Sequence, residues 1–101
     1  MSYTSKFKRE DIDDLFKVIM ALDSEEECYR FFEDVCTINE IHAIAQRWQV
    51  AKLLNEGRTY NEIEDITKAS TATISRVNKC LMYGAEGYKR MLDKVEGSEN
   101  K

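Results

Sequence analysis

The sequence of 101 residues has no proline, only four glycines and a single histidine, His42. Small β-sandwiches and β-barrels need many turn residues, so this scarcity argues against them and favours helices with few sharp turns. No apolar run approaches the roughly 18 residues that a membrane span needs. Residues 1–6 also lack the apolar core of a secretory signal. We therefore expect an all-α protein without a membrane segment.

Cysteine is also scarce, and its three copies, Cys28, Cys36 and Cys80, form no Cys-x-x-Cys pair. This pattern does not suit a disulfide framework and predicts a reducing, cytoplasmic location. The three thiols and His42 have the right chemistry for zinc, but their spacing matches no zinc pattern, and buried cysteines usually act as small apolar side chains. We expect neither a metal site nor an enzyme, because paired carboxylates, a phosphate-binding glycine loop and a nucleophile motif are missing.

The length and composition fit one domain that covers residues 1–101, with 43% hydrophobic residues to form a core. A domain of this size buries limited surface by itself, which favours a dimer or a bound partner. The formal net charge of −4 excludes a uniformly basic protein that coats nucleic acid.

Apolar residues at helical spacing and Ser/Thr-x-x-Glu capping boxes predict six helices. The first three expected helices cover about residues 10–22, a stretch ending near Val35, and a longer stretch that opens at the Thr37 capping box and runs through Ile41 to Gly57. The last three are a short one through Tyr60 and Ile66, one over about 71–82, and a short one through Tyr88 and Val95. The boxes begin at Ser24, Thr37 and Thr59. The ends, about residues 1–8 and 97–101, are expected to fray.

The third expected helix is apolar around much of its circumference, which is typical of a helix in the middle of an assembly. Its dimer and core positions are predicted to be Ile41, Ile44, Trp48, Leu53 and Leu54. In so short a chain this helix fits the core of a homodimer, and the alternative is a central helix of a monomeric bundle.

The segment from about residue 59 to 82 has the layout of a helix-turn-helix: a short helix, a turn of about four residues and a second helix. We expect its two helices to be joined by the inward-facing side chains of Ile63, Ile66, Ala69, Ile74 and Val77. The alternative is an ordinary helical hairpin with a solvated basic face.

Short polar groups and longer cations lie on the outward side of the second helix and in the turn. The candidate DNA-binding residues are Lys68, Ser70, Thr71, Ala72, Thr73, Ser75, Arg76 and Lys79. Short side chains let a helix end approach base edges in a major groove, and Arg or Lys can reach phosphates or guanine. This pattern predicts binding to double-stranded DNA.

The distribution of charge along the chain also favours DNA binding by this segment. Residues 67–85 contain three cations and no acid, whereas residues 10–34 contain ten acids against two cations. DNA should therefore attract the region of the candidate helix-turn-helix and repel the N-terminal region.

Several motifs occur together between residues 37 and 81. They are Leu53-Leu54, Thr59-Tyr60-Asn61-Glu62-Ile63, Ala72-Thr73-Ile74-Ser75-Arg76, and the pattern Thr37-x-x-Glu40-x-x-Ala43-x-x-x-Arg47. With them the sequence resembles the bacterial Trp repressor family, and is similar to its subgroup of Trp-repressor-related proteins of Gram-positive bacteria. The resemblance implies an intertwined all-α dimer, in which each subunit places a recognition helix in one of two successive major grooves.

The resemblance also implies a small-molecule corepressor such as L-tryptophan, held by Thr37, Arg47 and Arg76. Arginine suits this role, since guanidinium planes stack on aromatic faces and can hold a carboxylate. Val77, however, stands where the family has a glycine beside the ligand, and Cys80 where it has a serine. A branched side chain there fills the space of the indole. The favoured alternative is that Arg47 forms an internal ion pair and Arg76 contacts phosphate.

Two further departures concern DNA, because Asn61 and Glu64 replace basic residues of the family. An acid near phosphates weakens affinity, which predicts a different operator or weaker binding.

The leading hypothesis is a dimeric, sequence-specific DNA-binding transcriptional regulator, with repression expected. The alternative is a protein-interaction adaptor that keeps the helix-turn-helix only as structure and presents its acidic first half to a basic partner.

Overall fold

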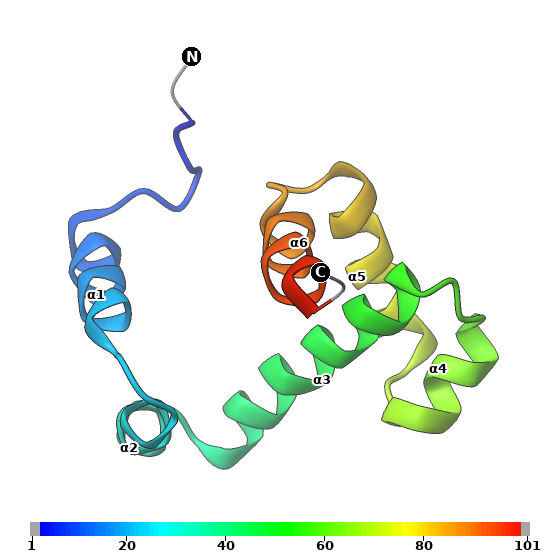
Figure 1. Cartoon of the computed structure of the whole chain (residues 1–101), viewed down its shortest axis with the longest axis horizontal. Helices are drawn as coiled ribbons and strands as arrows, with labels where there is room; N and C mark the ends of the chain where they lie inside the picture. The colour runs from blue at the N-terminus through cyan, green and yellow to red at the C-terminus, as the bar shows by residue number, and fades with distance from the viewer. Residues whose placement is uncertain (1–2, 100–101) are drawn as a thin grey trace. The chain divides into compact units, whose positions relative to one another are not determined.

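The structure, a computed structural model, describes the backbone of residues 3–99 and the side chains of residues 3–96. Six helices and no strand lie in this range (Figure 1). They are α1 Glu10–Ala21, α2 Glu25–Val35, α3 Ile38–Asn55, α4 Tyr60–Thr67, α5 Thr71–Tyr83 and α6 Gly87–Glu99. The predicted all-α fold with a helix-turn-helix is confirmed. Helix α6 extends into the stretch for which we expect fraying, and residues 1–2 and 100–101 lie outside the described residues.

The contacts within the chain divide it into two compact units, one up to Thr37 and one from Ile38 onward. The first unit contains α1 and α2, both strongly amphipathic, and neither helix has a buried residue. Large apolar side chains on these helices stay open to solvent, with Phe16 53% and Tyr29 65% exposed. The first unit thus has apolar faces without a core of its own.

Helix α2 begins at Ser24, whose hydroxyl accepts a hydrogen bond of 3.1 Å from the Glu27 amide. The second half of the predicted capping box is displaced by one residue. The Glu27 carboxylate accepts from the amide of Asp23, at 3.1 Å. The box thus forms one residue wider than the sequence pattern predicts, and α2 still has a satisfied first turn.

The second unit has a well-packed core where the C-terminal half of α3 contacts α4, α5 and α6. The buried cluster consists of Val50, Ala51, Ile63, Ala69, Ile74 and Val77. Leu53 and Leu54 are partly buried and pack against this cluster. Trp48, also partly buried, stacks on Tyr88 of α6 with the ring centroids 6.5 Å apart. Ile41 is partly buried and Ile44 is 49% exposed, so the first half of α3 is less covered than the second.

One inward position of the predicted helix-turn-helix is wrong. Ile66 is 56% exposed, whereas Ile63 is fully buried. A helix of only eight residues has a narrow buried side, and Thr67, four residues after Ile63, lies partly buried on that side. The Thr67 hydroxyl donates to the Ile63 carbonyl at 2.8 Å, so its polar group is satisfied there.

Candidate nucleic-acid interface

The α3–α4 connection fixes the direction of the short helix α4. The chain leaves α3 through Gly57, which has the left-handed φ of 85°. The Gly57 amide donates to the Leu54 carbonyl at 3.0 Å, and the Arg58 amide donates to the Leu53 carbonyl at 3.1 Å. These two bonds form a Schellman motif, which ends α3 sharply, as the sequence predicts for Gly57.

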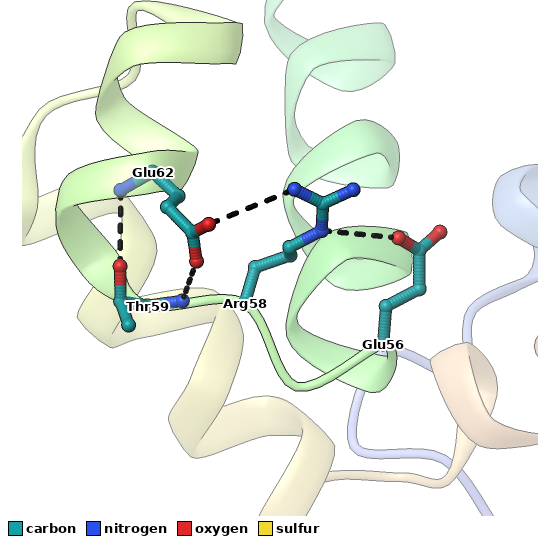
Figure 2. A network of polar contacts seen from close by, with 4 residues as sticks. All are labelled: Glu56, Arg58, Thr59 and Glu62. Carbon is teal, nitrogen blue, oxygen red and sulfur yellow. Dashed lines mark hydrogen bonds and ion pairs between the residues drawn. The ribbon is translucent and has the colours of Figure 1, made fainter.

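Helix α4 then begins with a complete capping box. Thr59 Oγ1 accepts from the Glu62 amide at 3.2 Å, and the Glu62 carboxylate accepts from the Thr59 amide at 2.9 Å. Figure 2 shows Arg58 between two carboxylates, 3.5 Å from Glu56 and 3.7 Å from Glu62. The bonds from Thr59, with a smaller contribution from Arg58, hold the pKa of Glu62 below its usual value of 4.5.

The turn between α4 and α5 is held by several hydrogen bonds. Lys68 has a left-handed φ of 64°, and its amide donates to the Glu64 carbonyl at 2.8 Å. The Ala69 amide donates to Thr67 Oγ1 at 3.1 Å, and Gln46 of α3 donates to the Thr67 carbonyl at 3.1 Å. Ala69 is only 4% exposed. Ala69 thus faces inward as predicted, and a small buried residue in the turn lets the two helices approach closely.

Helix α5 starts at Ser70, which accepts from the Thr73 amide at 3.1 Å. The Ser70 hydroxyl donates in turn to Thr73 Oγ1 at 3.1 Å. Ile74 and Val77 anchor one side of α5 in the core, because both are at most 1% exposed. This anchoring determines which residues of α5 face away from the core.

The structure places the eight predicted DNA-binding residues together on the turn and on the outward side of α5. Seven are exposed, and Thr73 is partly buried; the exposed ones are Lys68, Ser70, Thr71, Ala72, Ser75, Arg76 and Lys79. Within the described residues, Lys68, Arg76 and Lys79 form no ion pair, so their charges are available to an external anion. The arrangement offers short polar groups at one end and cations further along.

Glu64 adds a feature that the sequence analysis missed. Its carboxylate accepts a hydrogen bond of 2.6 Å from the hydroxyl of Thr71, across the turn. The sequence marks Glu64 as a departure from the family, but only the packing of α4 against α5 brings it to Thr71. No spacing rule predicts a contact between residues seven apart on two different helices.

The candidate effector residues are divided between the two units. Thr37 ends the first unit, whereas Arg47, partly buried, and Arg76, exposed, belong to the second. The predicted internal ion pair of Arg47 is absent from the described part of the chain, and Arg47 lies near the Tyr88 phenol instead. Burial raises the pKa of Tyr88, and the charge of Arg47 acts in the opposite direction.

A pocket of about 460 Å³ lies between α3, the end of α5 and α6. It is lined by Trp48, Cys80, Ala85, Gly87, Tyr88 and Met91. Cys80 is therefore in a pocket, whereas Val77 is 1% exposed and packs in the core. The side chain of Val77 completes the packing of α5 on α3 and α4.

Cys28, Cys36 and Cys80 are free thiols, and none of them is buried, contrary to the usual behaviour of structural cysteines. Among the side chains of residues 3–96, His, Cys, Asp and Glu form no group of three or more that could hold a metal ion. Over the same range, each helix is too short or too polar to cross a membrane.

Comparison with known proteins identifies the family. The family model of the Trp repressor protein matches residues 10–96, which is most of the chain. The chain belongs to the Trp repressor family. Proteins of this family are regulators rather than enzymes.

Three similar proteins support this assignment. The uncharacterized protein YerC of Bacillus subtilis is 54% identical over 94 residues, covering 93% of this chain and 90% of YerC. A solved structure of a TrpR-like protein from Eubacterium eligens has a TM-score of 0.87 and 52% identity, over 90% of this chain and 94% of that one. The crystal structure of a candidate Trp repressor from Staphylococcus aureus has a TM-score of 0.86 and 47% identity, over 90% and 91% of the two chains. The resemblance seen in the motifs thus extends over nearly the whole fold.

Proposed function

We propose that the protein is a dimeric transcriptional regulator that binds a specific DNA sequence through α5 and represses transcription. The observation that carries the proposal is the outward side of α5, where Arg76 and Lys79 are exposed and form no ion pair within the described residues. Exposed cations without partners suit phosphate or guanine, and the short side chains before them suit base edges. Membership of the Trp repressor family supports the same function.

The dimer is proposed from the large apolar side chains that stay exposed in the single chain. Helices α1 and α2 have apolar faces but no buried residue, and Ile38 and Ile44 on α3 are 65% and 49% exposed. Large exposed apolar faces of this kind are typical of an interface. A second copy of the chain supplies the same surface in return, as an isologous contact requires. Two copies of α5 then read two half-sites about one helical turn apart, as in other helix-turn-helix dimers.

We further propose that L-tryptophan is not a corepressor of this protein. Val77 occupies the position of the family's glycine beside the ligand, and it is buried in the core that holds α5. A close-packed site has no space for an indole ring. Calorimetry with L-tryptophan should give no binding heat, and tryptophan should leave the affinity for DNA unchanged. A measurable heat together with tighter DNA binding would contradict this.

A mobility-shift titration with genomic fragments in about 100 mM salt tests the main proposal, because specific binding outlasts non-specific binding at that salt. Arg76→Ala should weaken binding and reduce the salt dependence by about one released counterion. Arg30→Ala is the matched control, since Arg30 is also exposed but pairs with Glu26 on α2. Equal effects of the two substitutions would refute the assignment of α5.

The exposed apolar faces of α1 and α2 also favour a second candidate, an adaptor that binds another protein. The acidic first turns of these helices would suit a basic partner. A pull-down in the presence of nuclease distinguishes the two functions. Retention of a protein partner, with no DNA selected under any condition, would support the adaptor.

A further inference from the structure

The contact between Glu64 and Thr71 lies at the beginning of the proposed recognition helix. Thr71 is the first residue of α5 and is exposed, and Glu64 is a partly buried residue of α4. Thr71 Oγ1 donates its hydrogen bond to Glu64 Oε2 at 2.6 Å. This short distance is typical of a hydroxyl that donates to a charged carboxylate.

The contact changes what Thr71 can offer to a ligand. A threonine hydroxyl has one hydrogen to donate and two lone pairs to accept with. An ionised carboxylate can only accept, so the single hydroxyl hydrogen of Thr71 is committed to Glu64. For hydrogen bonding, the exposed side of the pair therefore offers oxygen lone pairs alone. A residue type that ordinarily serves either role becomes an acceptor.

Base edges in the major groove differ in this respect. Adenine N6 and cytosine N4 carry amino groups that donate, whereas guanine O6 and N7 and thymine O4 accept. We propose that the pair of Glu64 and Thr71 determines specificity by selecting adenine or cytosine at one position of each half-site and rejecting guanine and thymine there. This inference rests on the proposed DNA-binding function.

The charge of Glu64 also indicates that the first turn of α5 faces a base edge rather than the DNA backbone. A carboxylate beside the first turn of α5 repels a phosphate, although the N-terminus of a helix usually attracts one. The first turn of α5 has no acid of its own, so Glu64 also supplies the negative charge that its helix dipole favours. Phosphate contacts are left to Lys68, Arg76 and Lys79, whose side chains form no ion pair within the part of the chain that the structure describes.

The test is a selection of bound sequences from a random DNA pool, made with the wild-type chain, Glu64→Gln and Thr71→Val. Glutamine removes the charge, and its amide N–H can donate to the Thr71 oxygen, which frees the hydroxyl hydrogen for a base. Valine removes the hydroxyl with little change of shape. Asp65→Asn is the matched control, because Asp65 is the next residue of α4, is exposed, and loses the same charge. Circular dichroism and thermal melting of each variant establish that it folds.

The wild-type chain should show a position where adenine and cytosine bind about fivefold to tenfold better than guanine and thymine. Both Glu64→Gln and Thr71→Val should remove this preference at that same position, and Asp65→Asn should keep it. If the wild type selects a sequence but the two variants leave every base preference unchanged, the inference is wrong while the proposed function stands. If the wild type selects no sequence at all, both are wrong.

Discussion

Truncation of one exposed side chain of α3 tests whether this helix lies in the proposed dimer interface. Ile44 is 49% exposed in the single chain, so a partner can still bury about half of its side chain. Full burial of such a side chain stabilises by about 1.5–3 kcal/mol, which leaves about 1 kcal/mol for the exposed half. In a twofold-symmetric dimer the loss counts twice. Ile44→Ala should therefore weaken the dimer by about 2 kcal/mol, or roughly 30-fold in the dissociation constant.

Sedimentation velocity over a range of concentrations measures this constant directly. Met82→Ala is the control, because Met82 is 59% exposed on α5 and lies outside the proposed interface. This variant should dissociate like the wild type. A wild-type chain that stays monomeric at all concentrations, or an Ile44→Ala variant with an unchanged constant, would refute the reasoning.

Two further predictions concern the elements that hold α4 and its turn. Thr59→Ala removes the capping box of α4 and should lower the free energy of unfolding by about 1 kcal/mol in chemical denaturation. Because the folded pKa of Glu62 is lowered, its contribution is present above pH 4.5 and is lost as the pH falls through the folded value. Glu62→Gln, which removes the titrating group, should therefore lose less stability on acidification than the wild type, and parallel pH curves would contradict this. Lys68 has a left-handed φ of 64°, a conformation that costs energy for lysine but not for glycine. Lys68→Gly should therefore raise the free energy of unfolding by about 1 kcal/mol and, because it removes a cation, weaken DNA binding. A variant that binds DNA as tightly as the wild type would show that Lys68 does not contact phosphate.

The local signals of the sequence predict the helices well because they act over one helical turn. The capping box at Thr59, the N-cap at Ser70 and the glycine at Gly57 each form as their residue types require. The burial of Ile63, Ile74 and Val77 follows from their helical spacing. The exposed location of Arg76 on α5 follows from the same periodicity.

The features that the sequence could not predict depend on how one helix meets another. The spacing of Ile66 suits an inward position, but Thr67 takes that side of the short α4. The contact of Glu64 with Thr71 needs the crossing of α4 and α5, which no pattern along the chain encodes. Arg47 was expected in an ion pair and lies near Tyr88 because α6 packs against α3. Packing between helices, rather than local propensity, decides these three cases.

Selection of bound sequences from a random DNA pool with the wild-type chain in about 100 mM salt tests the central claim most directly. The proposed function predicts enrichment of one sequence with twofold symmetry, whose half-sites lie about one helical turn apart. A pool that remains random after repeated rounds would contradict sequence-specific binding by this protein. An enriched sequence without twofold symmetry would contradict the proposed dimer.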